Sequence, residues 1–151
     1  MKEIVKPLMQ WYAKHARTLP WRSDPTPYHV WLSEIMLQQT RVEAVIGYYD
    51  RFLEELPDVQ SLAAVSEERL LKLWEGLGYY NRARNLQKAA VQKCEQYQGK
   101  FPESYEEWLA LPGIGAYTAG AVTSIAFGKK EAAVDGNVYR IYTRLYADDT
   151  E

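Results

Sequence analysis

The stretch that decides the fold lies at residues 111–120 and reads Leu111-Pro112-Gly113-Ile114-Gly115-Ala116-Tyr117-Thr118-Ala119-Gly120. Its Pro-Gly-x-Gly turn joins two segments of helical pattern, and the two glycines remove side chains from the turn. Backbone N–H groups at such a turn can approach a phosphate closely. The stretch therefore predicts a helix, a turn and a second helix that hold the backbone of a nucleic acid.

A lone carboxylate follows this segment, in Val134-Asp135-Gly136-Asn137-Val138. An Asp before a glycine at the start of a helical pattern is typical of an N-cap, and the helix dipole favours its ionised form. An anion near bound DNA also suits a chemical role. The two interpretations, helix cap and catalytic group, are compatible, and the sequence leaves both open.

A second carboxylate, Glu34, lies in the middle of Val30-Trp31-Leu32-Ser33-Glu34-Ile35-Met36-Leu37-Gln38-Gln39-Thr40. The helix predicted here is apolar on nearly every side, so we expect partial burial to raise the pKa of Glu34. A raised pKa suits a general acid near neutral pH, and paired carboxylates in unlike environments are typical of glycosidic-bond cleavage. The alternative for Glu34 is an ion pair with Arg41 or Arg22.

Composition limits the classes of protein that remain. The chain has 151 residues, of which 47% are hydrophobic, and this suits one domain or two small lobes. No apolar run approaches the roughly 20 residues that span a bilayer, and the first residues lead into an amphipathic pattern, so we expect a cytoplasmic protein without a membrane partner. The single cysteine, Cys94, excludes an intramolecular disulfide and a clustered-cysteine metal site, and we expect no metal ligands in this chain.

Charge is distributed unevenly. The net charge of −2 argues against a protein that coats DNA indiscriminately. Between Glu75 and Glu95 there is no acidic residue, whereas Arg82, Arg84, Lys88 and Lys93 all fall there. This distribution predicts one basic face with acidic flanks; the alternative is an ordinary solvated helix face.

Helical periodicity runs through the chain, and no segment alternates with period two over a useful length, so we predict an all-α fold. Two capping-box patterns, Thr40 with Glu43 and Ser104 with Glu107, predict helix starts. The remaining helices are predicted at residues 4–16, 28–39, 66–76 and 81–98 and on both sides of the Pro-Gly-x-Gly turn.

Together these motifs resemble the helix-hairpin-helix base-excision DNA glycosylases, and within them the adenine-specific MutY family. Besides the turn, Asp135 and the Glu34 helix, the resemblance rests on Leu19-Pro20-Trp21-Arg22 and on Gly76-Leu77-Gly78-Tyr79-Tyr80-Asn81-Arg82-Ala83-Arg84-Asn85-Leu86. The hairpin with its trailing Asp is typical of the superfamily. Leu-Gln-Gln-Thr after the Glu and Gly-Tyr-Tyr before the basic helix indicate the adenine branch.

The resemblance implies a monofunctional enzyme of base-excision repair that hydrolyses the N-glycosidic bond of adenine mispaired with guanine or 8-oxoguanine. Its DNA partner is double-stranded, and the target adenine is flipped into a pocket. Glu34 would protonate the base at N7, and Asp135 would stabilise the sugar cation or bond to it. Tyr117 and Asn137 would support that intermediate. Because lyase members of the superfamily carry an amine at the position of Tyr117, the chemistry would stop at base release.

The same resemblance assigns the contacts to DNA. Trp21 and Arg22 would line the base pocket, and Gln39 and Tyr79 would fill or wedge the stack opposite the flipped base. Further substrate and DNA contacts are expected at Thr40, Arg82, Arg84, Gly113 and Gly115. A monovalent cation bound by hairpin carbonyls is also expected.

The resemblance further implies a six-helix barrel at residues 19–135, with the helix-hairpin-helix at about 105–127, and a following helix that begins within residues 136–151. Relatives continue into a segment whose four cysteines hold a 4Fe-4S cluster, so we expect this chain to be a fragment that stops before that segment. The N-terminal helix, residues 1–18, would normally pack on the missing part. Its exposed Leu8 and Trp11 would then favour self-association.

Other functions remain open at this point. One is a DNA-binding helix-hairpin-helix module without turnover. The others are a thymine-mismatch glycosylase and a pyrimidine-lesion glycosylase of the same fold. For all of them the expected location is the cytoplasm, in association with the nucleoid.

Overall fold

The computed structural model describes residues 2–147, and within this range every regular element is an α-helix. The helices are α1 (Lys2–His15), α2 (Pro20–Ser23), α3 (Pro27–Leu37), α4 (Val42–Glu55), α5 (Val59–Ala64), α6 (Glu67–Trp74), α7 (Asn81–Tyr97), α8 (Tyr105–Leu109), α9 (Ala116–Phe127) and α10 (Gly136–Tyr146). The all-α prediction is confirmed. None of the helices described is long and apolar enough to cross a membrane.

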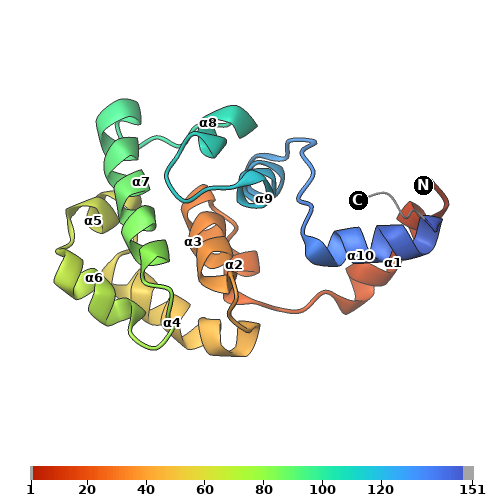
Figure 1. Ribbon diagram of the computed structural model, residues 1–151, viewed down its shortest axis with the longest axis horizontal. Helices are drawn as coiled ribbons and strands as arrows, with labels where there is room; N and C mark the ends of the chain where they lie inside the picture. The colour runs from red at the N-terminus through yellow and green to blue at the C-terminus, as the bar shows by residue number, and fades with distance from the viewer. Residues whose placement is uncertain (1, 148–151) are drawn as a thin grey trace.

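Helix α3 is at the centre of the packed helices (Figure 1). It packs against α2, α4, α7 and α9, while α5 packs on α7 and α8 packs on α9. The hairpin α8–α9 thus lies on one side of α3, and α4 to α7 lie on the other. Helices α1 and α10 stand at the far end, beyond α9.

The sequence explains the central position of α3. Pro27 occupies its first turn, and Thr26 caps it by accepting a hydrogen bond from the His29 N–H at 3.2 Å. Seven of its eleven residues are buried, and Trp31 packs edge to face on Trp108 of α8 with ring centroids 5.8 Å apart. Burial on nearly all sides is what the apolar sequence predicts, and it fixes the position of every polar side chain on the helix.

The helix-hairpin-helix forms as predicted, with α8 and α9 joined by the Pro-Gly-x-Gly turn. Ser104 caps α8 by accepting from the Glu107 N–H, so this capping prediction is confirmed. Gly113 has a φ of +74°, and a Cβ on it would lie 2.8 Å from the Cβ of Asn85 on α7. Gly113 is therefore required for the hairpin to pack against α7.

The second predicted capping box, Thr40 with Glu43, is wrong. Helix α4 begins at Val42, and its N-cap Arg41 makes no side-chain capping bond. The Thr40 hydroxyl instead donates to the Gln38 carbonyl at 3.4 Å and accepts from Arg82 at 3.4 Å. The turn between α3 and α4 engages this hydroxyl, so it is not free to cap the helix.

The prediction of a single basic face at residues 82–93 is also wrong. Lys93 is fully buried, with its ammonium 4.5 Å from the centroid of the Tyr97 ring and 4.7 Å from that of Phe101. This burial lowers its pKa to about 8. Arg82 is half-buried and points into the protein. Two of the four cations therefore do not contribute to an exposed face.

The terminal helices carry exposed apolar faces. Leu8 and Trp11 on α1 are 57% and 56% exposed, as expected, and on α10 Ile141 and Leu145 are 52% and 53% exposed. No residue of α10 is buried within the described structure. Self-association through α1 stays a prediction, as does the division of the chain at residues 18 and 135.

Candidate active site

Three helices far apart in sequence bring three of the four predicted catalytic residues to one pocket of about 430 Å³, while Asn137 is not among its lining residues. Glu34 comes from α3, Tyr117 from the first turn of α9 and Asp135 from the N-cap of α10. The remaining lining residues are Arg17, Leu19, Trp21, Arg22, Leu37, Gln38, Val42 and Ile125. The volume falls in the range of small-ligand sites, and apolar walls with a few convergent polar groups are typical of such sites.

Burial raises the pKa of Glu34 from 4.5 to about 7. Desolvation is the largest cause, and the nearby charge of Asp135 raises the pKa further, whereas Arg22 and a hydrogen bond from the Tyr117 hydroxyl lower it. The direction agrees with the prediction. The ion pairs of the described residues do not include Glu34, so the alternative of an ion pair with Arg22 or Arg41 is not what the structure shows.

Asp135 is the N-cap of α10, as predicted. One carboxylate oxygen accepts from the Val138 N–H at 2.8 Å, and the other accepts from the Asn137 side-chain amide at 3.2 Å. Arg140 in turn donates to the Asn137 side-chain oxygen at 2.6 Å. These contacts fix the carboxylate at the pocket wall, so the group that caps α10 is also the one for which the sequence predicts a catalytic role.

Burial and two neighbouring carboxyl groups all shift the pKa of Tyr117 in the same direction. Desolvation, together with the charges of Glu34 and Asp135, raises the pKa of the Tyr117 hydroxyl to about 12. The group therefore stays a neutral phenol near neutral pH, in a form that can donate a hydrogen bond to the Glu34 carboxyl.

Trp21 and Arg22, predicted to line the base pocket, both do so. Trp21 is buried and packs edge to face on Tyr49, with centroids 5.3 Å apart, so its ring is held rigidly. Arg22 is exposed, and its guanidinium donates to the Arg17 carbonyl at 3.2 Å. A planar aromatic wall and a cation at the rim suit a planar heterocycle carrying hydrogen-bond acceptors.

Gln39 and Tyr79 lie outside this pocket, on two adjacent loops. Both have left-handed backbone conformations, with φ of 57° and 48°, which cost free energy in non-glycine residues. Both side chains are exposed, and that of Tyr79 is 64% exposed. Exposed side chains on strained loops suit contact with a partner more than support of the core.

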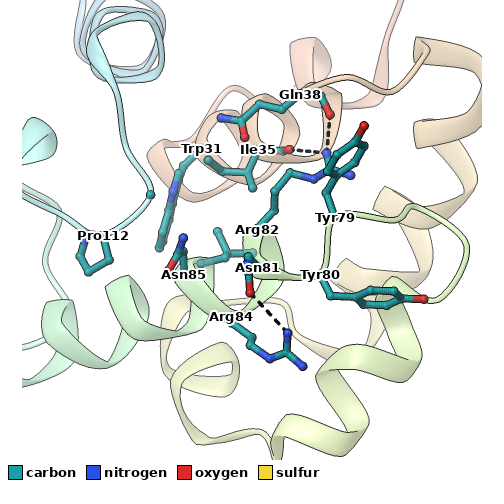
Figure 2. A pocket seen from close by; sticks show the side chains of 12 residues that line it. Trp31, Ile35, Gln38, Tyr79, Tyr80, Asn81, Arg82, Arg84, Asn85 and Pro112 are labelled. Atoms are coloured by element: carbon teal, nitrogen blue, oxygen red, sulfur yellow. Dashed lines mark hydrogen bonds between the residues drawn. The ribbon is translucent and has the colours of Figure 1, made fainter.

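The two predicted arginine contacts differ. Arg84 lies in part at the surface, where it pairs with Glu67 at 2.8 Å. Arg82 points into the protein, toward the carbonyls of Ile35 and Gln38 (Figure 2). Its guanidinium is occupied by protein acceptors, which leaves it poorly placed for the phosphate contact predicted from the charge pattern.

The two glycines of the hairpin also differ. A Cβ on Gly115 would meet no atom within 4 Å, and its φ of −94° is ordinary. Gly115 is the N-cap of α9 and provides no side-chain cap for the first amides of this helix. These amides lie at an exposed surface and suit an external anion, whereas Gly113 is needed for packing.

Six of the lining residues were not among the predicted site residues. Leu19 and Gln38 stand within quoted motifs without a predicted site role, and the others are Arg17 and three apolar residues, Leu37, Val42 and Ile125. Arg17 stands just before the quoted Leu19 motif, which is a usable signal. The three apolar residues look in sequence like any core residue, so no pattern distinguishes them as pocket walls.

A 4Fe-4S cluster does not fit the residues present. Four thiolates hold such a cluster, and the sequence has one cysteine, Cys94. Within residues 2–147 no group of three or more His, Cys, Asp or Glu side chains is placed to hold a metal ion.

A helix-hairpin-helix beside a pocket with paired carboxylates defines a class of DNA-processing protein, and the family comparison agrees. The chain belongs to the HhH-GPD superfamily of base excision DNA repair proteins, whose family model matches residues 32–151.

Curated relatives within this superfamily are named adenine DNA glycosylases. One from Buchnera aphidicola is 45% identical over 93% of this chain and 40% of its own length. One from Homo sapiens is 46% identical over 93% of this chain and 27% of its own length. The chain thus spans well under half of the relatives it matches.

Solved structures of related enzymes have the same fold. A thermostable thymine-DNA glycosylase superposes with a TM-score of 0.89 at 31% identity, covering 94% of this chain and 66% of that one. A non-covalent complex of endonuclease III with DNA gives a TM-score of 0.82 at 28% identity, covering 99% and 72%.

Proposed function

We propose that the chain is the catalytic core of an adenine DNA glycosylase that hydrolyses the N-glycosidic bond of an adenine mispaired with guanine or 8-oxoguanine. The observation that carries the proposal is that Glu34 and Asp135 line one pocket while their environments differ. The names of the curated relatives support adenine as the base. The endonuclease III complexes support DNA as the partner, and we propose that this DNA is double-stranded.

Glu34 acts first as the general acid. With a pKa of about 7 a substantial fraction of Glu34 is protonated near neutral pH, and this form transfers its proton to N7 of the flipped adenine. The C1′–N9 bond then breaks, and its electron pair leaves with the base. Tyr117 donates to the Glu34 carboxylate that results, which orients it and stabilises its new charge.

Asp135 stabilises the positive charge that develops on the sugar. The Val138 N–H and the Asn137 amide hold its two oxygens, so little reorganisation is needed as the charge appears. In the retaining course that we favour, an Asp135 oxygen bonds to C1′. Glu34 then takes a proton from water, the water oxygen bonds to C1′, and the Asp135 carboxylate leaves.

Contacts with the duplex surround this chemistry. Trp21 and Arg22 enclose the base, Gln39 and Tyr79 act on the stack opposite it, and Thr40 lies in the turn beside Gln39. The Gly115 turn and the first amides of α9 bind a backbone phosphate, and Arg84 adds a cation nearby. A monovalent cation at the hairpin carbonyls would strengthen the phosphate contact. Because the protein acts on DNA, we place it in the cytoplasm at the nucleoid; a cluster, where present, would need ligands from outside these 151 residues.

The test is single-turnover base release from duplexes that differ only in the mispaired base: adenine opposite guanine or 8-oxoguanine, thymine opposite guanine, and a pyrimidine lesion. Free adenine, with strands that break only after alkali, is the expected result. Release of thymine would favour the thymine-mismatch alternative, and strand cleavage without alkali would favour a lyase. Tight binding of mispaired duplex without release of any base would show a binding module.

A further inference from the structure

Arg82 makes an unusual set of contacts for a residue in a basic segment. One terminal nitrogen of its guanidinium donates to the carbonyls of Ile35, Met36 and Gln38 at 2.9, 3.0 and 2.6 Å. The other donates to Leu77 and Gly78, both at 3.1 Å. The second nitrogen also donates to the Thr40 hydroxyl at 3.4 Å. The acceptors belong to two separate loops, with one terminal nitrogen serving each loop's carbonyls.

The first group of acceptors lies at the C-terminal end of α3 and in the loop that follows it. The last carbonyls of a helix have no partner within the helix, and the negative end of its dipole favours a cation. Helix α3 ends at Leu37, and neither a lysine nor an arginine occupies its last turn. Arg82 supplies that cation from α7, so residue 39, with its φ of 57°, follows directly from a clamped segment.

The second loop joins α6 to α7 and leads into Tyr79. Leu77 and Gly78 are the two residues before it, and their carbonyls both accept from Arg82. The Trp74 indole N–H also donates to the Gly78 carbonyl at 3.2 Å, and the Arg82 guanidinium carbon lies 5.4 Å from the Trp74 ring centroid. The Arg82 guanidinium thus binds the residues just before Tyr79, whose φ is 48°, as well as those just before Gln39.

Figure 2 shows Arg82 reaching from α7 toward Gln38 and the carbonyl of Ile35, with Tyr79 beside its guanidinium. The same residues line a pocket of about 370 Å³ that continues to Pro112 and Gly113 of the hairpin. We call Arg82 and the carbonyls to which it donates the clamp. The clamp lies beneath the surface between Tyr79, a predicted wedge residue, and Gly113 of the hairpin, where a phosphate contact is predicted.

We propose that Arg82 is a positioning residue that ties the Gln39 loop to the Tyr79 loop, so that both side chains engage the base opposite the flipped adenine at a fixed separation. This inference rests on the proposed function for the roles of Gln39 and Tyr79. Lysine cannot replace Arg82, because one ammonium group does not present two sets of donors in a planar fork.

The test compares wild type, Arg82→Lys and the control Arg69→Lys. Arg69 is an exposed arginine of α6 that pairs with Glu55 of α4. Each is assayed for adenine release under single turnover on two duplexes: adenine opposite guanine, and the same adenine opposite an abasic analogue that offers no base to contact. Arg82→Lys should be about 100-fold slower on the mispair, because displaced groups lose that much, and within about threefold of wild type on the abasic duplex. Equal losses on both duplexes would overturn the proposal.

A second readout separates positioning from general support. In a Tyr79→Ala background, Arg82→Lys should add little further loss on the mispair, because residues that act through one another are not additive. Fully additive losses would contradict the clamp. If Arg82→Lys does not fold, Thr40→Val is used instead, because it removes one acceptor of the clamp. Thr40→Val should slow release from the mispair more than release from the abasic duplex, and an equal loss on both duplexes would contradict the proposal.

Amide hydrogen exchange tests the clamp independently of the proposed activity. In Arg82→Lys the segments 38–40 and 76–79 should both exchange faster, while α8 and α9 keep their wild-type protection. Unchanged exchange, or faster exchange in one segment alone, would contradict the clamp. If wild type released no base from any duplex, the proposed function would fail, and this measurement would still decide whether Arg82 joins the two loops.

Discussion

Glu34 of the buried helix α3 and Asp135 at the N-cap of α10 line the same pocket, and each is held by a different kind of surrounding. Desolvation is the largest influence at Glu34 and raises its pKa to about 7. Two hydrogen-bond donors hold Asp135 as an acceptor. In the proposed mechanism Glu34 is the acid and Asp135 the anion, and the first three of the following predictions depend on this difference.

The rate of base release should fall as the pH rises above about 7. Glu34 must be protonated to act, and its pKa is about 7. Above pH 8 the single-turnover rate should therefore drop about tenfold per pH unit, provided that no other group compensates. Glu34→Gln is the control, since its residual rate should not show this dependence. A flat wild-type profile between pH 6 and 9 would contradict the role of Glu34.

Glu34 should also reduce stability at alkaline pH. Its pKa rises from 4.5 to about 7 on folding, so its contribution is present in full below pH 4.5 and is lost as the pH rises through 7. Glu34→Gln removes this cost, and it should be more stable than wild type at pH 8 by about 2 kcal/mol, a value reduced for partial solvent screening. Urea unfolding at pH 5 and pH 8 measures the change. A difference between variant and wild type that does not depend on pH would argue against a buried acid.

Changes at Asp135 should separate its two roles. Asparagine keeps an oxygen for the Val138 N–H, so Asp135→Asn should unfold near the wild-type temperature while base release falls about 1000-fold. Asp135→Ala should lose activity and also about 1 kcal/mol of stability. Ser66→Ala, which removes the cap of α6, is the matched control and should lose stability alone. Near-normal base release by Asp135→Asn would leave only the capping role.

The hairpin glycines should respond differently to alanine. Gly113→Ala should cost about 2 kcal/mol or more, because its φ is positive and the new Cβ would meet Asn85. Gly115→Ala should cost less than about 1 kcal/mol, since its backbone is ordinary and the space is open, but it should weaken duplex binding. Thermal unfolding and DNA titration measure the two effects. Equal loss of stability in both variants would contradict this distinction.

The sequence predicted those features that depend on local chemistry. The Pro-Gly-x-Gly turn, the Asp135 cap and the apolar surroundings of Glu34 are all determined by neighbouring residues, and the structure has each of them. The structure also contains the short helix α5, which is capped by Asp58 and was not predicted. Its six residues are too few to show the repeat of apolar residues that identifies a helix in sequence.

What the sequence did not predict depends on distant backbone. Arg82 is positioned by the hydrogen bonds that it donates to the carbonyls of residues 35, 36 and 38. No side-chain pattern in the sequence identifies carbonyl groups as partners. Lys93 looks like a surface cation, but it is covered by the rings of Tyr97 and Phe101. A run of basic residues on one helix therefore gave no information about which of them face inward.

The most direct test of the central claim is the rate of adenine release by Glu34→Gln from a duplex with adenine opposite guanine, measured at pH 6.5 under single turnover. If Glu34 is the acid, release should fall at least about 1000-fold, while the affinity for the duplex is retained and the unfolding temperature is no lower than that of wild type. Release at the wild-type rate would contradict the account.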